Sequence, residues 1–183
     1  MTFKFLGFAG SLRKNSYNRA ALRAAQGLTP PEAALEIYDL ASIPLYNDDI
    51  REKGYPPEVQ DFRDKITAAD AIVMATPEYN YSISGILKNA IDWASRPPGP
   101  PLQKKPVAII GATQGLWGTV KAQFHLRQMC VFLDLWPLNK PEVLIAQAQN
   151  KFDAAGNLTD EMTKKVIAEL MTNLVTWTKK VSG

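Results

Sequence analysis

Five short apolar runs, each followed by a turn or a helix-forming stretch, constrain the fold of this chain more than any other feature. The runs are Phe3–Ala9, Leu35–Leu40, Ala71–Thr76, Pro106–Ala112 and Val143–Ala146. Strands that are apolar throughout are typical of a parallel sheet covered by helices on both faces. Right-handed crossovers then favour a doubly wound, five-stranded α/β sandwich with strand order 2-1-3-4-5.

Helices are expected between and after these strands. The segments concerned are Arg19–Gln26, Pro57–Ala68, Gly85–Arg96 and Asp160–Val181. Thr159 is placed to cap the last helix, whose expected apolar stripe is Met162, Val166, Leu170, Leu174, Trp177 and Val181. The proline-rich run 97–101 predicts a stiff surface loop, because proline continues neither a helix nor a sheet.

Composition and charge narrow the class of protein. The 183 residues are 46% hydrophobic and 21% charged, which is typical of one globular domain, and we expect residues 1–183 to form it. The net charge of +3 is small and basic residues alternate with acidic ones, so we expect no nucleic-acid partner. The chain has no signal-peptide pattern and no apolar run near the ~20 residues that span a bilayer, which predicts a cytoplasmic protein without a membrane partner. One cysteine and one histidine exclude an internal disulfide and leave little for a metal site.

In doubly wound sheets a ligand binds where the strand order reverses, beyond the carboxyl ends of the first and third strands. The first loop, 10–19, joins a strand to a helix, so its N–H groups gather at the positive end of the helix dipole. It also carries Ser11, Arg13, Ser16 and Asn18, which are donors that suit a phosphomonoester. The alternative is that Ser16 or Asn18 caps the helix and Arg13 is solvated. Because the loop combines so many suitable side chains, we favour anion binding.

Two more loops follow the third and fourth strands. The second loop, 76–85, contains Tyr79, Asn80 and Tyr81, whose aromatic and amide groups can stack on a flat ring and satisfy its polar edge. Either tyrosine alone could be an ordinary surface aromatic. The third loop, 111–118, is rich in glycine, which lets backbone approach a ligand or simply ends the strand.

The loop sequences resemble the NADPH-dependent FMN reductase family, and most closely its chromate and quinone reductase branch. The matching segments are Gly10-Ser11-Leu12-Arg13 with Ser16 and Asn18, Pro77-Glu78-Tyr79-Asn80-Tyr81-Ser82, Lys88-Asn89-Ala90-Ile91-Asp92-Trp93, and the run 118–128. The resemblance covers nearly the whole chain and implies a flavodoxin-like fold. It also implies that the cofactor FMN is held through its phosphate by Ser11, Arg13, Ser16 and Asn18, and along its ring by Pro77, Glu78, Tyr79, Asn80, Thr113 and Gly115.

The resemblance further implies an activity. NADPH or NADH would reduce the bound FMN, and a quinone, chromate, an azo compound or free flavin would then take the electrons, in a ping-pong sequence that needs no catalytic side chain. A flavodoxin-like electron carrier without nicotinamide activity is the main alternative, although such carriers are usually strongly acidic. A third alternative, an interaction protein that has lost its cofactor, disagrees with the intact first loop.

The helix expected after the third loop is apolar on both sides. Cys130 belongs to one apolar stripe, which predicts a buried thiol, while Phe124 and Val131 fall on the opposite side. A helix apolar on two sides needs a second packing partner, so we expect a homodimer or homotetramer that buries it. His125, on the same helix, is expected to be structural or to lie at an interface rather than to be catalytic.

Overall fold

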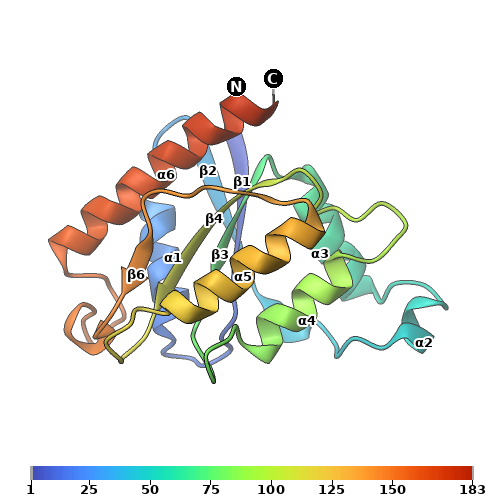
Figure 1. Ribbon diagram of the computed structural model, residues 1–183, viewed down its shortest axis with the longest axis horizontal. Coiled ribbons are helices and arrows are strands. Elements are labelled where there is room, and N and C mark those ends of the chain that lie inside the picture. Colours follow the sequence, from blue (N-terminus) through green and yellow to red (C-terminus); the bar gives the residue numbers. More distant parts are fainter. Residues whose placement is uncertain (1, 183) are drawn as a thin grey trace.

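The computed structural model describes residues 2–182, and residues 1 and 183 of the expected domain lie outside it (Figure 1). Strands and helices alternate along the chain. The strands are β1 (Phe3–Ala9), β2 (Ala33–Tyr38), β3 (Ala71–Ala75), β4 (Pro106–Ala112), β5 (Trp136–Pro137) and β6 (Val143–Ile145). The α-helices are α1 (Tyr17–Gly27), α2 (Asp48–Arg51), α3 (Pro57–Ala68), α4 (Gly85–Ala94), α5 (Val120–Leu133) and α6 (Glu161–Ser182).

All the strand pairs are parallel, and the sheet has the order β2-β1-β3-β4-β5, with β6 also paired to β4. The expected order 2-1-3-4-5 is therefore confirmed. One detail was not expected: the fifth position is shared, because β5 pairs with the start of β4 and β6 pairs with its end. A strand of only Trp136 and Pro137 gives no periodic signal, and its proline has no N–H to donate.

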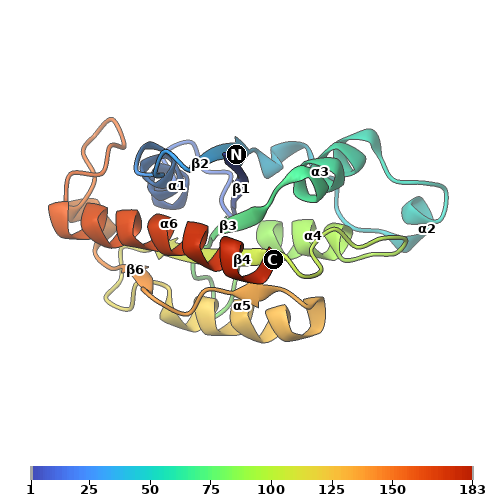
Figure 2. The same ribbon diagram turned by 90° about the horizontal axis from the view of Figure 1, so that it is seen from above.

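Helices cover both faces of the sheet (Figure 2). α1 and α6 pack on one face against alternate strand residues such as Val73 and Ile110, and α3, α4 and α5 pack on the other against Ile72 and Ile109. Every residue of β3 and β4 is buried. This explains why these strands are apolar throughout, as expected for a sheet covered on both faces.

The second strand lies earlier than expected. β2 ends at Tyr38, and Leu40 begins a short 3₁₀ turn, Leu40–Ser42, that the Asp39 carboxylate caps by accepting a hydrogen bond from the N–H of Ala41. The expected strand 35–40 missed this turn because Leu40 is buried in the core like a strand residue. An apolar residue beside a strand gives the same local signal whether its backbone is extended or turned.

The expected start and stripe of the last helix were wrong in detail. Asp160, not Thr159, caps α6, since its carboxylate accepts hydrogen bonds from the N–H and the hydroxyl of Thr163. Leu170 and Leu174 are buried as expected, but Met162 is exposed, and the buried stripe also contains Ile167, Met171 and Val175. Two adjacent sides of this helix carry apolar residues, and the side that packs on the sheet is the one that becomes buried.

Neither α6 nor any other helix within residues 2–182 has the length and apolarity needed to cross a bilayer.

Candidate functional site

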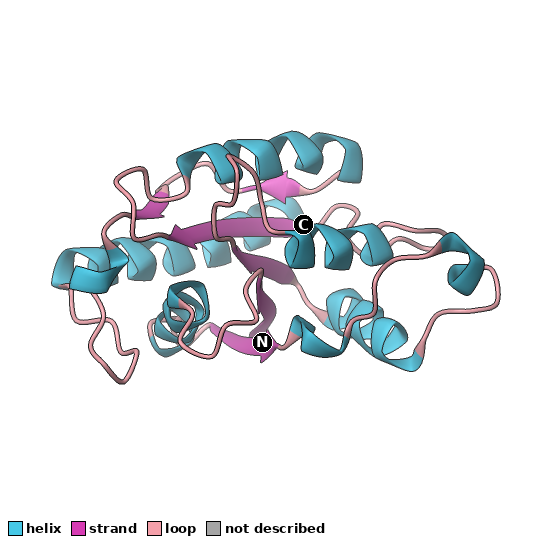
Figure 3. Cartoon of the chain, turned by 90° about the horizontal axis from the view of Figure 1, so that it is seen from below, coloured by secondary structure: helices cyan, strands magenta, loops and turns pink. Residues whose placement is uncertain are grey.

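The first, second and third loops meet at the carboxyl edge of the sheet (Figure 3). Main-chain bonds fix each loop to the neighbouring strand: the N–H of Gly10 donates to Ala75, that of Thr76 to Ile110, and that of Thr113 to Ile145. The first two loops also touch at Gly10, where a Cβ would lie 2.6 Å from the Ser84 hydroxyl. Glycine is therefore required for this close approach.

The first loop is shaped by its own residues. The N–H of Ser16 donates to the carbonyl of Arg13 at 3.0 Å, and the Ser16 hydroxyl caps α1 by accepting from the N–H of Arg19 at 3.3 Å. Ser11 and Ser16 are buried, whereas Arg13 is exposed with its guanidinium over the ring of Tyr17. The loop thus places hydroxyls, an arginine and a helix N-terminus around one point.

Asn18 connects the first loop to the third. Its buried side-chain amide makes two 2.9 Å hydrogen bonds with Ala112: Nδ2 donates to the carbonyl, and Oδ1 accepts from the N–H. The capping role weighed for Asn18 is thus taken by Ser16 alone. Of the two Nδ2 hydrogens, the Ala112 carbonyl takes one.

The second loop contains a tight two-residue turn. Tyr79 and Ser82 exchange two 3.0 Å main-chain hydrogen bonds, and the residues between them, Asn80 and Tyr81, have left-handed φ values of 52° and 65°. Residues other than glycine rarely adopt this conformation, and Tyr81 least readily of the two. The turn is therefore a conformation that surrounding contacts must hold.

Contacts from α5 hold the second loop, and the sequence did not reveal them. The Glu78 carboxylate accepts hydrogen bonds from the N–H groups of Lys121 at 3.0 Å and Ala122 at 3.1 Å. The Lys121 ammonium lies 3.2 Å from the centre of the Tyr81 ring. A hydrogen bond of 2.8 Å joins Ser82 Oγ to His125 Nδ1, which gives His125 a structural role as expected.

The third loop is open to solvent at its tip. Leu116 and Trp117 are exposed, and the Gly115 carbonyl accepts a hydrogen bond from the N–H of Gln147. Gly118 has φ +57°, and a Cβ there would lie 2.7 Å from the main chain of Leu144. Glycine at this position therefore lets the end of the third loop pack directly against β6.

These loops enclose a cleft of about 260 Å³ at the carboxyl edge. Its lining residues are Ser11, Arg13, Ser16, Tyr17, Asn18, Pro77, Glu78, Tyr79, Ala112, Thr113 and Gln114. Of the predicted site residues, Asn80 and Gly115 are outside this lining, the first at the tip of the turn and the second in the exposed third loop. The structure thus brings the other predicted residues together at one place.

The donor set suits a phosphorylated ring compound. The Arg13 end offers a cation, hydroxyls and the N-terminus of α1, which together favour a phosphate. The other end offers an aromatic side chain at Tyr79 and main-chain groups around Pro77, which suit a flat heterocycle. FMN has a terminal phosphate at one end and a flat polar ring at the other, so the residues present fit it.

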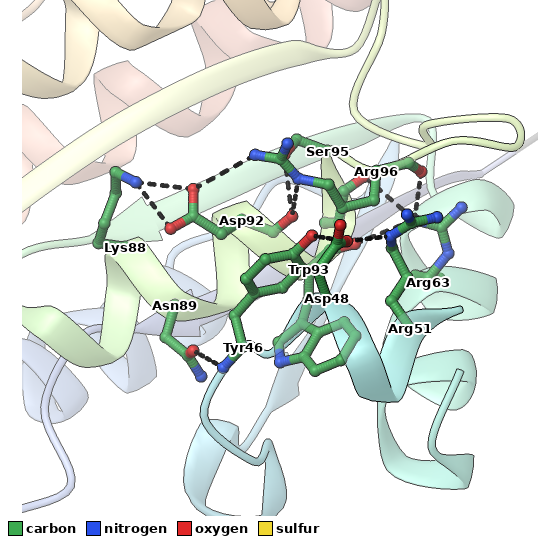
Figure 4. A network of polar contacts seen from close by, with 11 residues as sticks. Tyr46, Asp48, Arg51, Arg63, Lys88, Asn89, Asp92, Trp93, Ser95 and Arg96 are labelled. Carbon is green, nitrogen blue, oxygen red and sulfur yellow. Dashed lines mark hydrogen bonds and ion pairs between the residues drawn. The ribbon is translucent and has the colours of Figure 1, made fainter. Parts of the chain in front are cut away.

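None of the residues of the 88–93 motif lines this cleft, and its polar side chains belong to a separate network of contacts (Figure 4). Asn89 and Trp93 both donate hydrogen bonds to the carbonyl of Pro44 at 2.8 Å, and Asn89 accepts one from the N–H of Tyr46. Lys88 pairs with Asp92 on the outer side of α4. This motif therefore anchors the 44–46 segment to α4 and does not line the cleft.

A larger cleft of about 670 Å³ lies elsewhere, between α3 and the 97–101 loop. Its buried cation is Arg63, whose guanidinium donates to the carbonyls of Trp93, Ala94, Arg96, Pro98 and Gly99. Figure 4 shows Arg63 beside Trp93 and Arg96. Arg63 thus caps the C-terminus of α4 and orders the proline loop. Because those carbonyls occupy the guanidinium, we assign this cleft a structural role.

The inner side of α5 carries the expected buried cysteine. Cys130 is 1% exposed, and burial raises the pKa of its thiol to about 11. A thiol held protonated is a poor nucleophile, so this cysteine packs like a small apolar residue. The opposite side of α5 exposes Phe124, Val131 and Phe132.

Comparisons with known proteins agree with this geometry. Residues 3–150 match the family model of the NADPH-dependent FMN reductases. An NAD(P)H-dependent FMN reductase of Pseudomonas aeruginosa is 55% identical over 98% of this chain and 97% of its own length, and an NADPH:quinone oxidoreductase of Arabidopsis thaliana is 48% identical over 96% and 91%. The solved structure of FerB, a flavoenzyme NAD(P)H:(acceptor) oxidoreductase from Paracoccus denitrificans, superposes with a TM-score of 0.89 at 34% identity, covering 98% of this chain and 99% of FerB.

The resemblance inferred from the loop sequences is therefore confirmed, as is the flavodoxin-like fold. The match covers the first and second loops and the strands that position them. The chain belongs to the NADPH-dependent FMN reductase family.

Proposed function

We propose that this chain is an NAD(P)H-dependent oxidoreductase that holds FMN in the cleft at the carboxyl edge of the sheet and passes electrons to a quinone. Chromate, azo compounds and free flavin are further acceptors that an open cleft admits. When bound, FMN supplies the redox chemistry. The observation that carries the proposal is the meeting of a phosphate-suited loop and an aromatic loop in one cleft, in a chain of this family.

The phosphate end of the proposed site is the first loop. Arg13 provides a charge-assisted pair of N–H groups, and Ser11 and Ser16 provide hydroxyls beside the N-terminus of α1. Asn18 contributes its second Nδ2 hydrogen and keeps the loop against β4. These residues fix one end of the cofactor and leave its ring to the other loops.

The ring end is formed by Pro77, Glu78, Tyr79 and Asn80, with Thr113 and Gly115 on the border. Among residues 2–182, the N–H groups of Glu78 and Asn80 have no hydrogen-bond acceptor, which leaves them for the polar edge of the ring. The Tyr79 side chain is half exposed beside them. No residue on this list needs to transfer a proton.

The rim of the cleft explains the proposed range of acceptors. Tyr79 lines the cleft and is half exposed, and Leu116 and Trp117 are exposed on the third loop, so planar organic acceptors can stack on these side chains. A nicotinamide donor and an acceptor would use this one surface in turn, so we expect ping-pong kinetics. Initial rates at several fixed quinone concentrations should give parallel double-reciprocal lines, and intersecting lines would contradict a shared site.

We also propose that the protein is a homodimer, or a tetramer formed from two dimers, in which the outer side of α5 is buried. The side chains of Phe124, Val131 and Phe132 are exposed on this helix. Exposing several apolar side chains together to water is unfavourable, and such patches mark protein–protein contacts. Light scattering at micromolar concentration should give at least twice the monomer mass. A monomer mass would contradict this assignment.

The remaining assignments rest on the sequence. Residues 1–183 form one domain, and the single buried thiol suits a reducing cytoplasm. The interleaved charges suit neither nucleic acid nor a membrane surface.

The proposed activity is tested by loading the apoprotein with FMN and following NADPH consumption with a quinone. Turnover that requires both FMN and the quinone supports the proposal, and no turnover with either nicotinamide contradicts it.

A further inference from the structure

Helix α5 begins without a cap from its own sequence. Thr119, at the N-cap position, has a left-handed φ of 68° and no side-chain bond to the first turn. The Trp117 carbonyl accepts from the N–H of Val120. The next two N–H groups, those of Lys121 and Ala122, must find an acceptor elsewhere, because no residue precedes them within the helix by four positions.

Glu78 supplies that acceptor from the second loop. One carboxylate oxygen, Oε2, accepts from both N–H groups, at 3.0 Å from Lys121 and 3.1 Å from Ala122. A negative charge at a helix N-terminus also interacts favourably with the helix dipole. The cap of α5 is therefore a residue that lies more than 40 positions earlier, in the loop proposed to face the flavin ring.

The Glu78 contact is one of three that join α5 to the same five-residue stretch. The Lys121 ammonium makes a cation–π contact with the Tyr81 ring, and His125 makes a hydrogen bond with Ser82. The two left-handed residues, Asn80 and Tyr81, lie between Glu78 and Ser82. Strained turns persist only when the surrounding structure over-determines them, and here that structure is the first two turns of α5.

We propose that Glu78 is a positioning residue for the flavin. Its carboxylate fixes the second loop to α5, and this sets the direction of the main-chain N–H groups of Glu78 and Asn80 toward the ring. A well-ordered first turn of α5 therefore keeps these N–H groups in place, and part of the affinity for FMN depends on it. This inference rests on the proposed function, and it assigns the Glu78 side chain to the helix rather than to the ring.

The test compares Glu78→Ala and Glu78→Gln with Glu169→Gln, an exposed carboxylate on α6 that serves as the control. Hydrogen exchange of the Lys121 and Ala122 amides is followed by NMR without and with FMN, and the FMN dissociation constant is measured by fluorescence quenching. In Glu78→Ala we expect both amides to exchange about tenfold faster without FMN and the dissociation constant to rise about tenfold, the size expected for loss of a helix cap. Glu78→Gln retains an acceptor oxygen, so both effects should be smaller.

Other results would overturn the proposal. Faster amide exchange with unchanged FMN affinity would make Glu78 only a structural cap. Weaker FMN binding in both variants with unchanged amide exchange would mean that the carboxylate acts on the ring directly. If Glu78→Ala does not fold, the test rests on Glu78→Gln, in which the proposal still requires faster amide exchange and a higher FMN dissociation constant than in the unaltered protein. Absence of FMN binding by the unaltered protein would contradict the proposed function itself, and normal binding by both it and Glu78→Ala would contradict only the positioning role.

Discussion

The two ends of the proposed flavin site are held in different ways. The first loop keeps its shape through its own residues, since Ser16 caps the helix that follows it and bonds to Arg13. The second loop keeps its shape through α5, a helix more than 40 positions away in the sequence. The turn of the phosphate end is therefore encoded locally, with Asn18 adding one distant tie to Ala112, whereas the ring end depends on contacts with α5.

The difference predicts where the site is sensitive to change. Disturbing α5 should alter the ring end and spare the phosphate end. Altering the first loop should weaken cofactor binding without loosening α5. Asn18 lies outside this separation, because it ties the first loop to Ala112 at the end of β4.

Asn18→Ala should have the largest effect, because Asn18 ties the first loop to the end of β4. The substitution leaves the buried N–H and carbonyl of Ala112 without their partners. At ~1–3 kcal/mol for each orphaned group, the free energy of unfolding should fall by about 4 kcal/mol. Urea denaturation measures it, with the exposed Asn15→Ala as control, and a loss no larger than that of the control would contradict the structural role of the tie.

Arg13→Ala should weaken FMN binding by about 3 kcal/mol, roughly a hundredfold, by removing charge-assisted bonds to the phosphate. The free energy of unfolding of the apoprotein should not change, since Arg13 is exposed. Fluorescence titration gives the affinity, and Lys14→Ala should lose less because ammonium lacks the planar fork. Equal losses for the two variants would show that only net charge matters.

Raising the pH should destabilise α5 through Cys130. Burial raises the pKa of its thiol in the folded state to about 11, above its unfolded value of ~8.5. The stabilisation is therefore complete below about pH 8.5 and is lost as the pH rises toward 11, by on the order of 3 kcal/mol. Stability curves of the native protein and of Cys130→Ala should converge across this range. Parallel curves would show that this thiol does not titrate there.

Lys121→Met should have the smallest effect, because it removes one cation–π contact from the second loop. We expect a loss of ~0.5–1 kcal/mol, seen as weaker FMN binding at the ring end. Lys179→Met, at the exposed end of α6, is the matched control. If Lys121→Met also matched the unaltered protein, the Tyr81 contact would contribute nothing to the ring loop.

The sequence predicted the fold, and it predicted most of the residues that line the carboxyl-edge cleft, because both depend on local patterns. Apolar runs predicted five of the six strands to within two residues, and the donors Ser11 to Asn18 marked the first loop. Packing decided the rest. The split fifth position follows from β5 lying beside the start of β4, and the stripe of α6 follows from the face that β4 accepts.

The contacts between Glu78 and α5 illustrate the same limit at the site itself. Glu78 was correctly placed in the second loop, but nothing near it in the sequence indicates a helix N-terminus as its partner. The local sequence even points the other way, because Thr119 is of a residue type that favours the N-cap position. Only the structure shows that Thr119 makes no side-chain bond to the first turn of α5, so that an acceptor must come from elsewhere.

The central claim is tested most directly by the visible spectrum of the FMN-loaded protein under anaerobic conditions, before and after NADPH is added. The account predicts that NADPH bleaches the flavin band and that a quinone restores it. A bound flavin that neither NADPH nor NADH bleaches would contradict the reductase and favour an electron carrier. No retained flavin would contradict the assignment of the carboxyl-edge cleft to FMN.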